Sequence, residues 1–170
     1  MDRLWAPWRA SYIRKAVKVN PKGCVFCKSL QEFQKGKSSQ VVEVSRFSFS
    51  ILNIYPYNNG HLMVMPLRHV GNFQSLRPAE LADMMRLLQK TQASLTRVLK
   101  PHAFNICLNL GREAGSGILD HLHFHIVPRW NGDTNFMPLL GGTKVISESL
   151  EAVRERLNHD IQKRNRRTRK

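Results

Sequence analysis

The stretch DHLHFHIVPRW, at residues 120–130, places histidines and apolar residues at alternate positions. In an α-helix, side chains two positions apart point about 200° apart around the axis, so His123 would face away from His121 and His125. In a β-strand, the three histidines share one face and the apolar residues between them share the other. The alternation therefore predicts a strand with one histidine face and one apolar face.

Three chemical interpretations of the histidine face follow from the residues alone. It could be a polar strand edge without a function, although three histidines in strict alternation make that interpretation weak. Two histidines could bind zinc with a third ligand elsewhere and leave an open position for an activated water. Alternatively, one imidazole could be a nucleophile whose other nitrogen is held by a hydrogen-bond acceptor. Side chains on one face lie roughly 6.6 Å apart, so we expect neighbouring rings not to touch.

A glycine-bearing loop precedes the histidine strand and bears on this choice. Backbone N–H groups of a glycine-rich turn can bind a phosphate, and a serine hydroxyl adds another donor. The loop at 111–117 and the end of the preceding stretch contain Asn109, Gly111, Gly115, Ser116 and Gly117. Beside a histidine strand in a basic chain, this loop favours phosphoryl or nucleotidyl chemistry.

The remaining pattern predicts an α+β fold with helices beside an antiparallel sheet. Short runs of β-branched and aromatic residues predict further strands at 41–45, 47–54, 61–66 and 104–110. Apolar residues at three-and-four spacing predict a long amphipathic helix that starts after Pro78 and ends before Pro101. The same spacing predicts a C-terminal helix that starts near Ser147.

The chain carries 27 Lys and Arg against 12 Asp and Glu in 170 residues. We expect one domain over residues 1–162, with an irregular segment at 1–20, followed by a basic tail at 163–170. Such a tail is typical of a solvated end, with non-specific nucleic-acid contact as the alternative, and the remaining positive charge favours a polyanionic substrate. No apolar run approaches about 20 residues and the N-terminus has no signal-peptide pattern, so we expect a cytoplasmic protein that does not enter a membrane.

The cysteines leave several interpretations open. GCVFC places Cys24 and Cys27 at a spacing that suits a metal site, a redox pair or two buried thiols. Nothing in that spacing alone separates the three. Cys107 alternates with apolar neighbours in FNICLNL, so we expect a small buried residue there.

The sequence HLHFHIV resembles the signature of the histidine-triad (HIT) superfamily of nucleotide hydrolases and transferases. The similarity extends through LWAPWR, GCVFC, ILNIYPYNNGHLMVMPLRHV and HIVPRWNGDTNFMP, and is greatest to the branch that contains diadenosine tetraphosphate phosphorylases. The resemblance implies a HIT-like fold, which is an antiparallel sheet of about five strands with a long central helix and a C-terminal helix. It also implies a homodimer.

The resemblance further implies a role for each site residue. His123 would attack the α-phosphorus of a nucleotide and form a covalent nucleotidyl-histidine, His125 would contact the phosphate or the leaving group, and His61 would support the catalytic histidine. The nucleoside pocket would include Ile51, Asn53 and Ile54, where Asn53 stands at a position that is often an aspartate bound to the ribose. The phosphates would be bound by Asn109, Gly115, Ser116 and Gly117.

Zinc-containing members of the superfamily join two such cysteines to two histidines. The corresponding residues are Cys24, Cys27, His69 in PLRH, and His121. Two thiolates and two imidazoles make a closed tetrahedral set, which is structural because it leaves no position for water.

The leading hypothesis is a nucleotidyl transferase or hydrolase that cleaves dinucleoside polyphosphates, with either phosphate or water as the acceptor. A nucleoside phosphoramidase or adenylyl-conjugate hydrolase is the enzymatic alternative. A nucleotide-binding module with little turnover is the third, and the intact triad argues against it, because binding alone does not require a nucleophile.

Overall fold

The structure is a computed structural model that describes residues 23–133 and 148–167. The irregular segment expected at 1–20 and the sequence LWAPWR lie outside these residues, as does the predicted helix start at Ser147. Within the described part of the chain, no helix is both long enough and apolar enough to cross a membrane.

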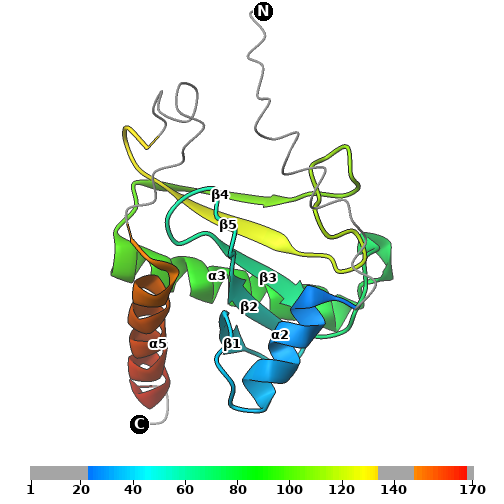
Figure 1. Ribbon diagram of the computed structural model, residues 1–170, viewed down its shortest axis with the longest axis horizontal. Helices are drawn as coiled ribbons and strands as arrows, with labels where there is room; N and C mark the ends of the chain where they lie inside the picture. The colour runs from blue at the N-terminus through cyan, green and yellow to red at the C-terminus, as the bar shows by residue number, and fades with distance from the viewer. Residues whose placement is uncertain (1–22, 134–147, 168–170) are drawn as a thin grey trace, which may run out of the picture.

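Five antiparallel strands form one sheet in the order β1-β2-β3-β5-β4. Their bounds are Val41–Val44 for β1, Ser48–Leu52 for β2, Leu62–Pro66 for β3, Ala103–Leu108 for β4 and Phe124–Arg129 for β5. The three N-terminal strands follow one another along the sheet, and β5 lies between β3 and β4 (Figure 1). The predicted α+β class and the five-stranded sheet are confirmed.

The long helix α3 spans Pro78–Leu99. Proline at the first helical position is compatible with the helix because its missing N–H would have no partner there. The Glu80 carboxylate accepts a hydrogen bond from the Arg77 backbone N–H at 2.8 Å, which satisfies a donor at the helix start. The helix ends at Leu99 and is followed by the C-cap residue Lys100, whose left-handed backbone (φ 49°) precedes Pro101.

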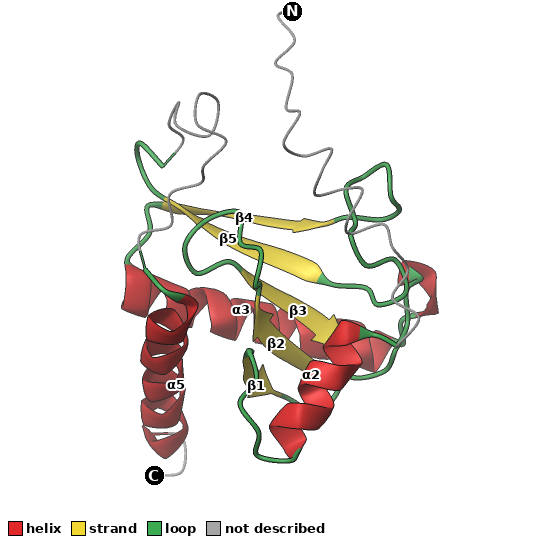
Figure 2. Cartoon of the chain, viewed as in Figure 1, coloured by secondary structure: helices red, strands yellow, loops and turns green. Residues whose placement is uncertain are grey.

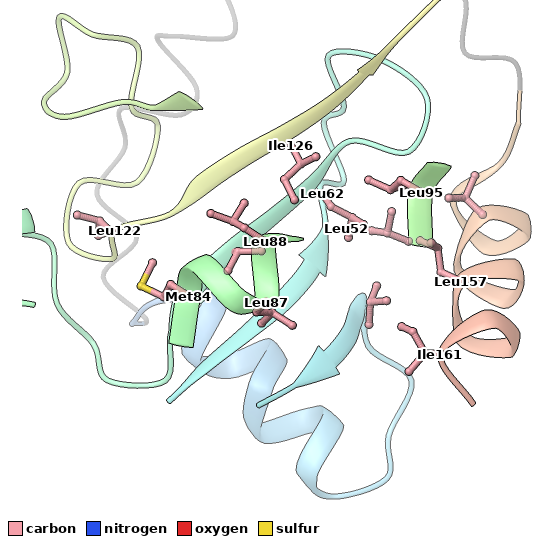
Figure 3. Packing of buried hydrophobic residues seen from close by; sticks show 13 residues of the cluster. Leu52, Leu62, Met84, Leu87, Leu88, Leu95, Leu122, Ile126, Leu157 and Ile161 are labelled. Atoms are coloured by element: carbon pink, nitrogen blue, oxygen red, sulfur yellow. The ribbon is translucent and has the colours of Figure 1, made fainter. Parts of the chain in front are cut away.

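Helices cover both faces of the sheet (Figure 2). On one face, α3 and the C-terminal helix α5, Leu150–Arg167, bury a cluster of aliphatic side chains against the strands. Figure 3 shows this cluster, which includes Leu52, Leu62, Met84, Leu87, Leu95, Ile126 and Leu157. On the other face, α2, Val25–Gln34, packs Phe26 and Leu30 against Phe49 and Met65. Successive strand residues therefore feed two separate clusters.

The histidine segment alternates as predicted, but its strand is shorter than predicted. Leu122 packs in the α3 cluster, while His121 and His123 are buried on the other side. The strand itself begins at Phe124. The register, in which Val64 pairs with Phe124, would place Pro66 opposite Leu122, and proline has no N–H for the ladder. The expectation that His121 and His123 lie within the strand is therefore wrong.

Two peripheral expectations also differ from the structure. Cys107 is exposed, because β4 is the edge strand of the sheet and the described helices do not cover it. The helix α5 continues to Arg167, so residues 163–167 of the predicted basic tail are helical. Arg164 in that stretch forms an ion pair with Glu43 at 2.6 Å.

Candidate active site and metal centre

A cavity of about 720 Å³ opens on the α2 side of the sheet. That volume is in the range of small-molecule and cofactor sites. Its wall includes eight residues that the sequence assigned to the nucleotide site, namely Ile51, Asn53, Ile54, Gly115, Ser116, Gly117, His123 and His125. Two assigned residues lie outside the wall. Asn109 stands beside Gly115, and His61 is fully buried against His125.

His123 has one nitrogen held by the backbone. Its Nδ1 lies 2.8 Å from the carbonyl oxygen of His121, and a carbonyl can only accept, so Nδ1 carries the proton. The neutral ring then has an unprotonated Nε2. Burial lowers the pKa of His123, which keeps the ring uncharged near neutral pH. Phe26 packs against this ring at 5.1 Å between centroids. The arrangement provides an oriented nucleophile in the cavity wall.

His125 belongs to a chain of hydrogen bonds that starts at a backbone amide. The Tyr57 N–H donates to His61 Nδ1 at 3.0 Å, so this nitrogen is an acceptor. The proton of neutral His61 is then on Nε2, which lies 2.9 Å from His125 Nδ1 and donates to it. His125 in turn keeps its proton on Nε2. Burial lowers the pKa of His125 to about 4, so the ring is a neutral donor near pH 7.

The histidine rings are closer together than strand geometry predicted. The centroids of His123 and His125 are 4.9 Å apart, with the ring planes at 71°. The expectation of rings that do not touch is wrong, because His123 precedes the regular strand and the two rings tilt toward each other. The two rings are therefore close enough for His123 and His125 to contact the same bound group.

A second cluster lies next to this cavity. The ligand atoms of Cys24, Cys27, His69 and His121 all lie within 4.8 Å of one another. Cys24 Sγ is 3.3 Å from His121 Nδ1, and Cys27 Sγ is 3.6 Å from Nδ1 of His69 and of His121. A tetrahedral zinc ion with ordinary bond lengths needs sulfur and nitrogen about 3.5 Å apart. These residues could hold such an ion.

Burial and hydrogen bonding prepare the ligands. His121 Nε2–H donates to the carbonyl oxygen of Pro66 at 2.9 Å, which leaves Nδ1 turned toward the thiols. Burial lowers the pKa of His121 to about 4, so the ring is neutral, as a metal ligand must be. Burial and the nearby Cys24 raise the pKa of Cys27 to about 11, and a divalent cation would counter this effect because it binds thiolates.

Three chain segments meet at this cluster. Cys24 caps the N-terminus of α2, His69 follows β3 and His121 precedes β5. The Leu122 N–H donates to the Val70 carbonyl at 2.8 Å. Gly71 makes this close approach possible, because a Cβ there would overlap the carbonyl oxygen of Leu119. The packing places the rings of His69 and His121 5.2 Å apart.

Sequence reasoning missed several residues of the cavity wall. Tyr57 stacks on His125, with centroids 5.7 Å apart and planes at 27°, yet the sequence analysis gave this residue no role. Arg112 also lines the cavity, but the sequence analysis assigned only the glycines of this loop, Ser116 and the nearby Asn109 to the phosphates. Phe26 is a spacer residue within the C-x-x-C stretch. In each case the sequence names the residue, but only the fold shows which ring or cavity its side chain faces.

Comparisons with known proteins agree with this geometry. A sequence model of the family described as the HIT domain matches residues 34–132. An AP-4-A phosphorylase of Mycobacterium tuberculosis is 40% identical over 163 residues, which are 92% of this chain and 83% of that protein. An adenosine 5'-monophosphoramidase of Schizosaccharomyces pombe is 29% identical over 139 residues, or 81% of this chain and 98% of that protein.

Solved structures give the same fold. A zinc-bound histidine triad family protein from Mycobacterium smegmatis superposes with a TM-score of 0.66 at 25% identity, over 84% of this chain and 96% of that chain. A hypothetical histidine triad nucleotide-binding protein from Sulfolobus tokodaii superposes with a TM-score of 0.65 at 24% identity, over 82% and 93%. These superpositions confirm the predicted arrangement of sheet, long helix and C-terminal helix.

Proposed function

The chain belongs to the HIT family of nucleotide enzymes, and on that premise we propose that it cleaves dinucleoside polyphosphates through a covalent nucleotidyl-histidine intermediate. The hydrogen bond from His123 Nδ1 to the His121 carbonyl carries this proposal, because it leaves Nε2 as an uncharged nucleophile beside the cavity. The 40% identity to an AP-4-A phosphorylase supports diadenosine tetraphosphate as the substrate.

The reaction would have two steps. In the first, His123 Nε2 forms a bond to the α-phosphorus and the bond from that phosphorus to the bridging oxygen breaks. The leaving polyphosphate carries the electron pair of the broken bond as an anion, and His125 Nε2–H is suited to donate a hydrogen bond to it without transferring the proton. In the second, phosphate or water attacks the same phosphorus and His123 leaves. With phosphate as acceptor, diadenosine tetraphosphate yields ATP and ADP.

The cavity wall supports this substrate class. Ile51 and Ile54 offer apolar surface for a base, and Asn53 is beside them for a ribose. Gly115, Ser116 and Gly117 line the cavity where the reacting phosphate would lie. The Ser116 hydroxyl and the N–H groups of Gly115 and Ser116 donate to carbonyl oxygens of the loop, so we propose that they exchange these partners when the phosphate binds. In addition, Arg112 is the basic side chain of that loop, and we assign it to the outlying phosphates.

We assign a structural zinc ion to Cys24, Cys27, His69 and His121. Two thiolates and two imidazoles complete a tetrahedral set of four ligands, so they would leave no position for a reacting water. Such an ion would supply no chemistry and would hold α2 against the segments that carry His69 and His121. The zinc-bound Mycobacterium smegmatis protein of the same fold supports this assignment.

We also propose a homodimer that uses the edge of β4. Among the described strands, β4 is paired on one side only, by β5. Ile106 on this strand is 50% exposed, although it is aliphatic. An unpaired strand edge with apolar residues is a common site of association between copies of a chain.

Product analysis tests the proposed function. The protein is incubated with diadenosine tetraphosphate, with and without inorganic phosphate, and the nucleotides are identified by chromatography. ATP and ADP formed only with phosphate support a phosphorylase, while ATP and AMP formed without phosphate support a hydrolase. Release of AMP from adenosine 5'-phosphoramidate with no cleavage of the tetraphosphate would favour the phosphoramidase alternative. No turnover of either compound would contradict the proposal.

A further inference from the structure

The Asn53 side chain has an orientation that its hydrogen bonds define. Its Oδ1 lies 2.9 Å from the Tyr55 backbone nitrogen, which can only donate, so this atom is the amide oxygen. The other end of the amide is therefore the NH₂ group. It lies 3.3 Å from His61 Nδ1.

Two donors thus face the same nitrogen of His61. The Asn53 NH₂ group approaches Nδ1 at 3.3 Å, and the Tyr57 N–H approaches it at 3.0 Å. A proton on Nδ1 would face both donors in a ring that is only 1% exposed. The proton is therefore confined to Nε2, from which it reaches His125 at 2.9 Å.

We propose that Asn53 is a positioning residue, whose NH₂ group keeps the proton of His61 on Nε2 and thereby keeps the proton of His125 on the nitrogen that serves the substrate. This inference deepens the proposed function and rests on it for the catalytic role of His125. The positions of the protons on His61 and His125 in the protein without substrate do not depend on the proposed function.

An aspartate at this position would reverse the hydrogen bond. One carboxylate oxygen can still accept from the Tyr55 N–H, but the other would face His61 Nδ1 as an acceptor. A proton on Nδ1 then becomes favourable, as an imidazolium ion or as the other neutral tautomer. If the neutral tautomer changes, His61 Nε2 becomes an acceptor, His125 must donate from Nδ1, and the substrate loses its donor.

A ribose-binding role predicts a different order of activities. Aspartate accepts hydrogen bonds from ribose hydroxyls, so Asn53→Asp would preserve that contact while Asn53→Ala would remove it. The positioning role predicts the opposite order. Alanine leaves the Tyr57 N–H as a donor to Nδ1, whereas aspartate opposes it. The expected order of kcat is wild type, then Asn53→Ala, then Asn53→Asp.

Nitrogen-15 spectra of the histidine rings test the inference directly. His61 is assigned from the signals that disappear in His61→Gln, and spectra are recorded near pH 7 without substrate. We expect wild-type His61 to have a proton on Nε2 only and the Asn53→Asp protein to have one on Nδ1. Asn72→Asp is the matched control, because Asn72 accepts from the Gln74 N–H and an aspartate can do the same. It should leave the His61 signals unchanged.

Kinetics separate positioning from binding. We expect Asn53→Asp to lower kcat by about tenfold or more while KM changes less than about twofold. Unchanged His61 signals in Asn53→Asp would overturn the inference, as would a proton on Nδ1 in the wild type. A lower kcat for Asn53→Ala than for Asn53→Asp would also overturn it. If wild-type protein turned over no nucleotide, the proposed function would fail while the ring spectra still decided the positioning role.

Discussion

His121 of the metal cluster and His123 of the cavity wall leave opposite ring nitrogens unprotonated, although they lie two residues apart in the chain. In the metal cluster, His121 donates from Nε2 to Pro66 and turns Nδ1 to the thiols. In the cavity, His123 donates from Nδ1 to the His121 carbonyl and leaves Nε2 unprotonated, which is the nitrogen we propose as the nucleophile. Neighbouring histidines on one face thus acquire different chemistry because each has its own backbone acceptor.

The two regions also differ in whether they have room for a substrate. The metal cluster consists of four ligand atoms within 4.8 Å of one another, which leaves no space for one. His123 and His125, the histidine pair, instead border a cavity of about 720 Å³. We therefore expect the metal cluster to determine stability and the histidine pair to determine turnover. The following predictions test that division.

Removal of the nucleophile should have the largest effect. We expect His123→Ala to lower the turnover of diadenosine tetraphosphate by roughly 10⁴-fold or more, because it removes the proposed nucleophile. Zinc content should stay unchanged. His159→Ala, which alters an exposed histidine of α5, is the control. Ordinary turnover in His123→Ala would show that another group forms the intermediate.

Removal of a metal ligand should mainly affect stability. We expect purified wild type to contain about one zinc per chain, and Cys24→Ser to lose the metal together with several kcal/mol of unfolding free energy. Metal analysis and urea unfolding measure the two quantities. The matched control is Cys107→Ser, because Cys107 is an exposed cysteine outside the cluster. A wild type prepared without chelators that contains no zinc would contradict the assignment.

Acid should destabilise the cavity region through His125. Burial lowers the pKa of this ring to about 4, while the unfolded chain takes up the proton near pH 6.5. The unfolded state therefore binds more protons between these values, and stability falls as the pH drops from about 6.5 to about 4, by roughly 3 kcal/mol. His125→Asn should lose this share of the pH dependence in urea unfolding at several pH values. An identical pH dependence in both proteins would exclude a neutral buried His125.

The smallest effect is expected at the mouth of the cavity. Arg112→Gln should raise KM for diadenosine tetraphosphate about fivefold, since an exposed charge contributes about 1 kcal/mol, and should change kcat little. The rise should shrink at high salt because screening weakens the wild-type contact. Lys90→Gln removes an exposed charge from α3 as the control. An equal rise in both variants would assign the effect to net charge alone.

The sequence predicted which side of the sheet each residue faces better than where the strand begins. Alternation alone placed Leu122 and Ile126 on the side opposite the histidines, because side chains two positions apart in extended chain share a side. The strand start could not be predicted in this way, since it depends on Pro66 lying opposite Leu122 in another strand. Likewise, the exposure of Cys107 depends on the position of β4 at the edge of the sheet.

The candidate site was likewise predicted only in part. The resemblance to a known family assigned the metal ligands and the nucleophile, and the structure brings the four ligands together. The stacking of Tyr57 on His125 and the approach of Asn53 to His61 had no sequence signal. Both depend on the conformation of the loop between β2 and β3, where one ångström decides whether a hydrogen bond forms.

The most direct test of whether the histidine pair, and not the metal cluster, carries out the chemistry is to identify the residue that carries the covalent nucleotide. Protein mixed briefly with diadenosine tetraphosphate in the absence of phosphate is quenched in base, and its intact mass and peptide masses are recorded. We predict one adenylyl group, attached to His123, which is absent from His123→Ala and present in His159→Ala. An adenylyl group on His121, on His125 or on a residue outside the triad would contradict the assignment of His123 as the nucleophile.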